Sequence, residues 1–317
     1  MAVYTHVSDD QITNFLADYR LGTVTDFKEI AEGIENSNFY LVTSMGKYIL
    51  TLFEKRTDAG DLPFFIQLMD HLSSSGIACP KSVVNQFGDA LGGLCGRPAL
   101  IVSFLPGRPV NDVTVDCVQQ LGQRLASMHM ATMNFKKTRI NNLSLSGWHD
   151  MFGRIKDRAD EIQPGIAAYI IDELSWLDQN WPENLTRGII HGDLFPDNVF
   201  FDDGCLSGFI DFYFACDDVL VYDLAVCINA WCFEQNGTFN KMLAAKLLAG
   251  YESARPLDER EFNALNACLR GSAMRFLLTR MYDALNPVEQ ALVAPKDPIE
   301  FWRILDFHKN NTNWERS

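Results

Sequence analysis

The sequence predicts an α+β protein with a small strand-rich N-terminal lobe and a larger, mainly helical C-terminal lobe. β-rich runs dominate the first hundred residues, whereas helical periodicity dominates after Gly107. The strands do not alternate with helices in the way that a parallel sheet requires. We therefore expect two lobes, residues 1–106 and 107–317, joined by a connector near 103–109.

The N-terminal lobe should be built from hairpins and one helix. The run "FYLVTSMGKYILTLF" (39–53) has two β-rich halves around a Met-Gly pair, which is typical of a hairpin. The run "DLPFFIQLMDHLSSSG" (61–76) predicts a helix, because Asp61 can cap its start and Gly76 follows its end. Residues 80–107 return to short strands separated by glycine turns.

Helices should make up most of the C-terminal lobe. We expect His129 and Trp148 to be packed helical residues. Residues 189–213 form the only clear β insertion in this part of the sequence. The segments with helical periodicity are 117–133, 169–179, 220–235, 239–252 and 262–285.

Composition narrows the possible partners and compartment. The net charge of −14 disfavours nucleic acid, although a small anionic substrate can still bind a locally basic pocket. Apolar runs fall short of the roughly 18 residues that span a membrane. The start "MAVYTHVSDDQITNF" lacks the basic and apolar regions of a signal peptide. Eight irregularly spaced cysteines, without a C-x-x-C pair, predict reduced and mostly buried thiols in a cytoplasmic protein.

The segment "IIHGDLFPDNVFFDDGCLSGFIDFY" (189–213) carries the residues with candidate chemistry. Two apolar runs bracket an Asp-Gly pair, which predicts a hairpin. If its centre lies at 204–205, Asn198 stands opposite Asp211 and their side chains share a face. A carboxylate and an amide oxygen that converge in this way suit Mg²⁺.

Asp193 lies five residues before Asn198. That spacing equals the step from Asp to Asn in the catalytic loop of protein kinases, where the Asp orients the attacking hydroxyl group. A reading of these residues as turn and loop-capping groups explains residues 202–204 but not the combined set of Asp193, Asn198 and Asp211. We expect His191 to be a structural hydrogen-bonding residue that shapes the loop.

These motifs resemble a known group of enzymes. "HGDLFPDNVFF" followed by "FIDF" is similar to the motif of the aminoglycoside phosphotransferase and choline kinase group, which has the protein-kinase-like fold. With "YILTLFE", "LPFFIQLMDHL", "YDLAVCINAWCF" and "MRFLLTRMYD", the chain resembles the homoserine kinases of that fold over nearly its whole length. The resemblance implies ATP- and Mg²⁺-dependent phosphorylation of the side-chain hydroxyl of L-homoserine, on the route to threonine.

The resemblance also implies roles for the residues of the C-terminal lobe. Asp193 would be the catalytic base, and Asn198 and Asp211 would be the Mg²⁺ ligands. Asp223, in the first turn of a predicted helix, would brace the catalytic loop. The neighbouring Asp217 and Asp218 could cap that helix or face the substrate.

In the N-terminal lobe the resemblance implies an ATP site. "EGIENSNFYLV" would lie over the phosphates and contact them through backbone N–H groups and the side chains of Ser37 or Asn38. In "IVSFLPG", backbone groups of Ser103 and Leu105 would bond adenine, although an ordinary edge strand and turn would explain that stretch as well.

One position departs from the protein-kinase pattern. Thr51 occupies the place of the phosphate-binding lysine in V-A-I-K. Lys47 and Lys55 share its face of the strand, but each is four residues away, roughly 13 Å. The phosphate charge must then be met by metal, by backbone N–H groups or by another residue.

The residues that bind the amino acid are less defined. Arg275, Arg280 and Asp283 lie on one predicted helix, and the two arginines stand about 140° apart around it. An Arg suits the substrate carboxylate and an Asp suits its ammonium group, but an internal ion pair between Arg280 and Asp283 explains them equally well. The alternatives for the whole chain are phosphorylation of another small alcohol, such as an aminoglycoside or choline, and a non-catalytic nucleotide-binding regulator. The oligomeric state does not follow from the sequence.

Overall fold

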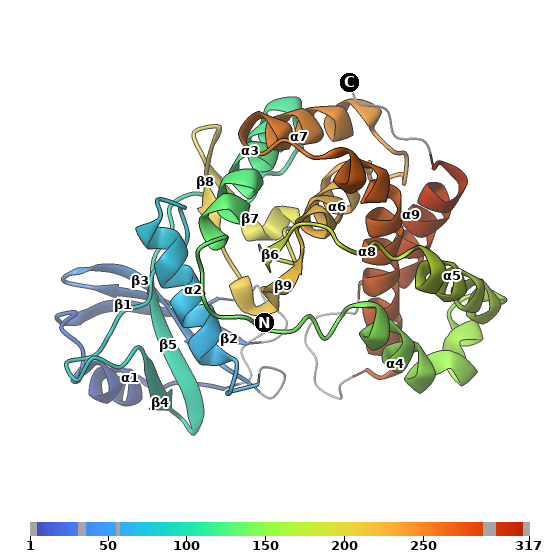
Figure 1. Ribbon diagram of the computed structural model, residues 1–317. Helices are drawn as coiled ribbons and strands as arrows, with labels where there is room; N and C mark the ends of the chain where they lie inside the picture. Colours follow the sequence, from blue (N-terminus) through green and yellow to red (C-terminus); the bar gives the residue numbers. More distant parts are fainter. Residues whose placement is uncertain (1–4, 31–35, 55–57, 288–295, 313–317) are drawn as a thin grey trace. The chain divides into compact units, whose positions relative to one another are not determined.

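A computed structural model describes residues 5–30, 36–54, 58–287 and 296–312 of the 317-residue chain. These residues divide into two compact units, one that ends at Pro106 and one that begins at Gly107 (Figure 1). The first unit is dominated by an antiparallel sheet and the second by helices, which confirms the predicted α+β fold class.

The first unit contains a five-stranded antiparallel sheet with the order β1-β2-β3-β5-β4. The predicted hairpin is present, because β2 and β3 pair from Ser37↔Leu52 to Thr43↔Gly46. The glycine-rich stretch after residue 80 forms the last two strands, as expected. The strands are β1 (Val24–Ile30), β2 (Ser37–Thr43), β3 (Gly46–Leu52), β4 (Leu91–Leu94) and β5 (Arg97–Ser103).

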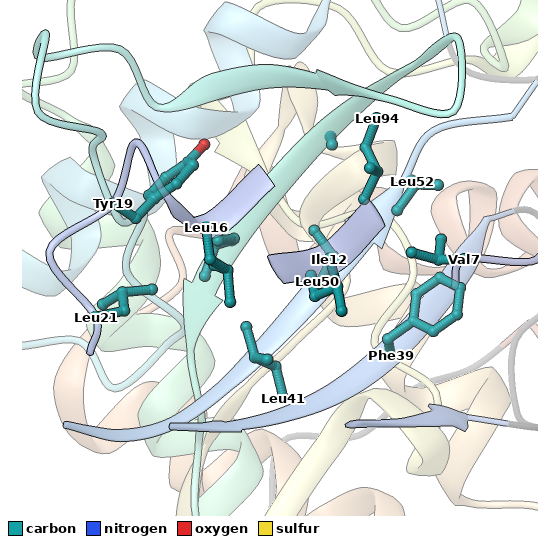
Figure 2. Packing of buried hydrophobic residues seen from close by; sticks show 12 residues of the cluster. Val7, Ile12, Leu16, Tyr19, Leu21, Phe39, Leu41, Leu50, Leu52 and Leu94 are labelled. Carbon is teal, nitrogen blue, oxygen red and sulfur yellow. The ribbon is translucent and has the colours of Figure 1, made fainter. Parts of the chain in front are cut away.

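Apolar side chains on one face of this sheet build the core of the first unit (Figure 2). Phe39 and Leu41 of β2 lie with Leu50 of β3, and all three are fully buried. Ile12 and Leu16, from the short helix α1 (Asp9–Leu16), complete the cluster. Each of these side chains contributes roughly 1.5–3 kcal/mol through burial.

Helices of the first unit are only partly those that the sequence predicts. Helix α2 (Leu62–Ser74) occupies the predicted segment, with Asp61 at its N-cap and Gly76 at φ 81° after its end. Helix α1 was not predicted. Its eight residues are mostly polar, but its start carries a capping box in which Ser8 and Gln11 exchange side-chain to backbone hydrogen bonds.

The second unit is a helical assembly with two small β ribbons (Figure 1). The long helix α8 packs on α4, α6 and α9, while α3 packs on α7. No helix within the described ranges has the length and apolarity to cross a membrane. The helices are α3 (Val115–Thr132), α4 (Leu145–Ile155), η1 (Lys156–Glu161), α5 (Ile166–Asn180), α6 (Leu220–Trp231), α7 (Lys241–Ala254), α8 (Glu259–Leu285) and α9 (Pro298–Asn310).

Two β ribbons interrupt these helices, whereas the sequence predicts one. The first pairs β7 (Val199–Asp202) with β8 (Cys205–Phe209) and lies in the predicted insertion. The second pairs β6 (Arg187–Ile190) with β9 (Cys216–Val219), just before α6. The strand β9 has the sequence Cys-Asp-Asp-Val, which is too short and polar to be recognised from periodicity. This second ribbon sets the start of the loop that follows β6.

Helices α3 and α7 approach each other at two glycines. A Cβ atom at Gly122 would lie 2.1 Å from the carbonyl oxygen of Leu247, and one at Gly250 would lie 2.1 Å from that of Gln119. Because the obstructing atoms belong to the backbone, neither helix can accommodate a methyl group without a shift.

We predict that Gly122→Ala lowers the free energy of unfolding by about 1–3 kcal/mol, since the two helices must separate. The matched control is Gly153→Ala in α4, where no atom lies within 4 Å of the added Cβ. The control should gain about 1 kcal/mol, the usual difference in helix propensity. Urea unfolding monitored by circular dichroism measures both changes, and equal stability of the two variants would contradict the close approach.

Candidate active site

A buried carboxylate holds the loop that begins after β6. Asp223 lies in the first turn of α6 and has no solvent exposure. Its Oδ2 accepts the backbone N–H of His191 and its Oδ1 accepts that of Gly192, both at 2.8 Å. Burial disfavours the charged form, but these bonds and His129 outweigh it, so the pKa of Asp223 is lowered.

His129 of α3 is a third donor to this carboxylate. Its Nε2 lies 3.0 Å from Oδ2 of Asp223, and its Nδ1 lies 2.8 Å from the hydroxyl of Tyr251. The side chain of Arg255 reaches the same hydroxyl at 3.2 Å and pairs with Glu261. His129 is buried, as predicted, but its partnership with Asp223 was missed. The signal in the sequence was a histidine on an apolar helical face.

His191 links the loop to the end of the β7–β8 ribbon. Its Nε2 donates to the carbonyl of Ile210 at 2.9 Å, and its Nδ1 accepts the backbone N–H of Asp193 at 3.3 Å. Burial lowers the pKa of His191 to about 4, although the nearby Asp223 opposes this shift. The ring is therefore neutral near pH 7, and both of its nitrogens hold backbone groups.

Asp193 is the carboxylate that the loop presents. The residue is half-buried. The amide nitrogen of Asn198 donates to the Asp193 carbonyl at 2.8 Å and to Oδ2 at 3.2 Å. Burial raises the pKa of Asp193 to about 6, while the positive charge of Arg275 opposes the rise. The group is more basic than an ordinary Asp yet largely ionised at neutral pH.

The β7–β8 ribbon differs in register from the prediction. Its turn consists of Asp203 and Gly204, both with positive φ, so Asp202 pairs with Cys205. A bulge after Phe200 then shifts the pairing, and the N–H of Ile210 bonds the carbonyl of Asn198 at 3.0 Å. The predicted direct opposition of Asn198 and Asp211 is therefore wrong by one residue.

Asp211 follows the residue that pairs with Asn198. It is exposed and left-handed, at φ 62° and ψ 61°, and it opens the short helix η3 (Phe212–Phe214). Asn198 ends the short helix η2 (Pro196–Asn198). The bond from His191 to Ile210 fixes the peptide just before Asp211. No cluster of three His, Cys, Asp or Glu side chains suited to a metal occurs in the described part of the chain.

The predicted substrate arginines occupy different places. Arg275 is 3% exposed, donates to the carbonyl of Gly192 and stacks 4.6 Å from the ring of Phe276. Arg275 is therefore a buried cation that contacts the backbone of the loop after β6.

Arg280 contacts the start of α9 instead. It donates to the Asp297 carbonyl at 2.9 Å and pairs with Glu300 at 2.6 Å. Asp283, on the same helix, is half-buried. The structure thus brings Arg275 to the loop and commits Arg280 to a contact between α8 and α9.

The predicted phosphate-binding side chains lie in the first unit. Ser37 is fully buried, and its hydroxyl donates to Glu54 at 2.8 Å. Asn38 stands opposite Thr51 on the β2–β3 ladder, and its Oδ1 accepts the Thr51 hydroxyl at 2.8 Å. Ser37 therefore contributes to the sheet, whereas Asn38 and Thr51 form a polar pair where protein kinases place a lysine.

The connector is anchored by one of its predicted residues. The N–H of Ser103 donates to the carbonyl of Lys81 at 2.8 Å, and its hydroxyl accepts the Lys81 N–H at 3.0 Å. Residues 31–35 of the expected phosphate loop, and Lys55, lie outside the described residues.

The remaining acids near α6 serve the β6–β9 ribbon. Asp217 pairs with Arg187 at 2.8 Å, and Asp218 accepts the side-chain amide of Asn141 at 2.6 Å. Asp218 also accepts the N–H of Val219 at 2.7 Å, directly before the helix. Trp148 is buried, as expected for a core residue.

A braced loop that presents one carboxylate and one amide, with a second carboxylate after a short ribbon, is the arrangement of phosphoryl-transfer enzymes with a kinase-like fold. Comparison with known proteins supports this class. The model of the phosphotransferase enzyme family matches residues 26–257. Among solved structures, amicoumacin kinase has a TM-score of 0.72 at 16% identity, covering 96% of this chain and 94% of its own. Choline kinase from Cryptosporidium parvum has a TM-score of 0.68 at 12% identity, covering 96% of both chains.

Relatives of much higher sequence identity indicate which phosphotransferases this chain resembles closely. Homoserine kinase of Methylobacterium radiotolerans is 54% identical over 98% of this chain and 96% of its own. Homoserine kinase of Rhodospirillum rubrum is 53% identical over the same shares. The chain belongs to the homoserine kinases of the phosphotransferase enzyme family.

We predict that His191 makes the protein sensitive to acid. Because its folded pKa of about 4 lies below the usual 6.5, the unfolded chain binds the extra proton first, and stability falls between pH 6.5 and 4. The loss from this group reaches about 3 kcal/mol at the lower end. Unfolding free energies at pH 7 and 4.5 should therefore differ less in His191→Asn than in the wild type. His149→Asn, at an exposed pair with Asp178, should keep the wild-type difference. An unchanged difference in His191→Asn would refute the assignment.

Proposed function

We propose that the protein transfers the γ-phosphoryl group of ATP to the side-chain hydroxyl of L-homoserine and yields O-phospho-L-homoserine. The observation that carries this proposal is the identity of more than half of the aligned residues with homoserine kinases over 98% of the chain. The aminoglycoside and choline kinases share the fold at only 12–16% identity. The fold alone therefore gives the reaction class, and the relatives give the acceptor.

Asp193 acts as the base in this proposal. Its carboxylate accepts a hydrogen bond from the acceptor hydroxyl and takes its proton as the phosphoryl group is transferred. A pKa of about 6 leaves it mostly ionised at pH 7 while making it a better proton acceptor than an ordinary Asp. The hydrogen bonds from Asn198 fix the direction of the Asp193 carboxylate. A bound acceptor hydroxyl is therefore aligned for attack on the phosphoryl group.

The residues around the loop keep that carboxylate in place. Asp223 accepts the backbone N–H groups of His191 and Gly192, and Arg275 donates to the carbonyl of Gly192. His191 stays neutral and bonds the N–H of Asp193 itself. None of these groups exchanges a proton with substrate in our scheme.

Asn198 and Asp211 are the proposed Mg²⁺ ligands. The amide NH₂ of Asn198 is used within the loop, so its oxygen remains as a donor to a cation, and Asp211 adds an exposed carboxylate. One amide oxygen and one carboxylate match the sparse protein coordination of Mg²⁺, which takes its other ligands from water and phosphate. When bound, the ion would supply positive charge to the phosphate oxygens.

The first unit is the proposed nucleotide-binding unit, and residues 107–317 are the proposed catalytic and substrate unit. Adenine would bond to the carbonyl of Ser103 and the backbone of Leu105. Asn38 and Thr51 offer polar contacts to phosphate in place of a lysine, which increases the reliance on Mg²⁺ and backbone N–H groups. Ser37 is left out of this set because its hydroxyl serves Glu54.

We also propose a cytoplasmic enzyme that does not bind nucleic acid. All eight cysteines are free thiols and six of them are buried, which suits a reducing compartment. The net charge of −14 disfavours a phosphate backbone as partner.

We predict that Asp193→Ala lowers kcat by two or more orders of magnitude, roughly the contribution of a positioned general base. The control is Asp202→Asn, at the end of β7 and exposed, which should keep wild-type turnover. Circular dichroism would show that both variants are folded. Wild-type turnover in Asp193→Ala would rule out the assignment of the base.

An acceptor screen tests the function itself. Purified protein with Mg-ATP should release ADP in the presence of L-homoserine, and far more slowly with choline or an aminoglycoside. Phosphate in the product should lie on the side-chain oxygen, which ³¹P and ¹H NMR can locate. Faster turnover of choline or an aminoglycoside would overturn the proposed acceptor, and no transfer to any alcohol would favour a non-catalytic regulator.

A further inference from the structure

An ion pair lies beside the proposed base and takes no part in the bracing of the loop. Lys296 precedes α9, and its Nζ lies 3.6 Å from Oδ2 of Asp197 in η2. The side chains are 51% and 62% exposed, respectively. At this distance the two charges attract each other but do not form a tight charge-assisted hydrogen bond, which would need about 2.7–2.9 Å.

The loop brings this pair close to Asp193. The side chain of Asn198 bonds Asp193, and Asp197 immediately precedes Asn198 in the chain. The Nζ atom of Lys296 lies 5.4 Å from the centre of the Phe195 ring. In the sequence, Phe195 stands midway between Asp193 and Asp197. In agreement with this placement, the positive charge of Lys296 lowers the pKa of Asp193, and Asp197 raises it.

Of the two described cations that act on the charge of Asp193, Lys296 is the accessible one. Arg275 also acts on the charge of Asp193, but it is 3% exposed and is bonded to the carbonyl of Gly192. Arg280 is 9% exposed and is committed to Glu300 and to the carbonyl of Asp297. A substrate carboxylate can therefore reach Lys296 without breaking an internal contact of the fold.

The surroundings hold Lys296 in position. Arg280 bonds the carbonyl of Asp297, the residue after Lys296, and lies 4.5 Å from the ring of Phe301. That ring also packs 5.1 Å from Phe276, which contacts Phe195 at 4.8 Å. The backbone that carries Lys296 is thus fixed against the segment that carries Asp197.

We infer that Lys296 and Asp197 form the head-group subsite for an α-amino-acid acceptor, a conclusion that rests on the proposed function. Lys296 binds the α-carboxylate and Asp197 binds the α-ammonium group, so the substrate replaces their mutual attraction with two complementary contacts. In homoserine, only a short methylene chain separates the α-carboxylate and α-ammonium groups from the side-chain hydroxyl. This short separation fits the closeness of Lys296 and Asp197 to Asp193. Arg280 is a positioning residue that acts through Asp297.

The test compares acceptors that lack one charge. L-Homoserine has both charges, its carboxamide lacks the carboxylate, and 4-hydroxybutyrate lacks the ammonium group. In Lys296→Met the KM for homoserine should rise about tenfold to a hundredfold, the range of one charged hydrogen bond. The KM for the carboxamide and the KM for ATP should stay near their wild-type values. In Asp197→Asn the KM for homoserine should rise, and that for 4-hydroxybutyrate should not.

Two further variants serve as controls. Lys296→Arg should restore most of the preference for homoserine over its carboxamide. Lys309→Met removes a lysine of α9 that pairs with Glu173 at 3.7 Å, and it should leave the preference unchanged. If the wild type does not phosphorylate homoserine, the proposed function fails. If the wild type does so and Lys296→Met keeps the wild-type preference for homoserine over its carboxamide, only the head-group subsite is refuted.

Discussion

The site depends on one buried carboxylate. Asp223 has no exposure, and it receives the N–H groups of His191 and Gly192 and the ring of His129. A buried charge is costly unless such partners satisfy it, and buried N–H groups are costly in turn without an acceptor. The carboxylate of Asp223 and the N–H groups of His191 and Gly192 therefore satisfy each other, and this mutual bonding fixes the conformation of the loop. The positive end of α6 adds to the stabilisation of the charge. The direction of Asp193, two residues after His191, follows from this arrangement.

Around Asp223, the residues that hold the loop differ in their chemistry from Asp193, the proposed base. His191 is kept neutral by burial and uses both nitrogens on backbone atoms. Arg275 directs its charge at a carbonyl and at aromatic rings, so it moderates the rise in the pKa of Asp193 without forming a direct ion pair with it. A direct pair would lower the basicity of the carboxylate. Asp193 therefore keeps a pKa of about 6, raised by burial.

The sequence contained most of this arrangement but not its details. The motif residues near 191–198 were recognisable because their types and spacing are unusual together. The Asp-Gly pair indicated the turn, but the turn is centred between Asp203 and Gly204 and not at 204–205. The bulge opposite Phe200 was not predictable, since the single Gly208 beside it does not fix a register. The turn centre between Asp203 and Gly204, together with this bulge, places Ile210 and not Asp211 opposite Asn198. Long-range partners such as Tyr251 for His129 have no local signature. Lys296 was overlooked because an exposed lysine before a helix looks like any surface lysine.

The residues that hold the loop also determine at what stage of chain synthesis the loop can form. Tyr251 is 122 residues from His129, and Arg275 is 83 residues from Gly192. Contacts between such distant positions form slowly, because the chain must close long segments before they become favourable. A nascent chain should therefore remain inert on the ribosome until residue 275 has emerged, however early the motif itself is translated. Truncated translation products of this gene would then carry the signature of the enzyme without its catalysis.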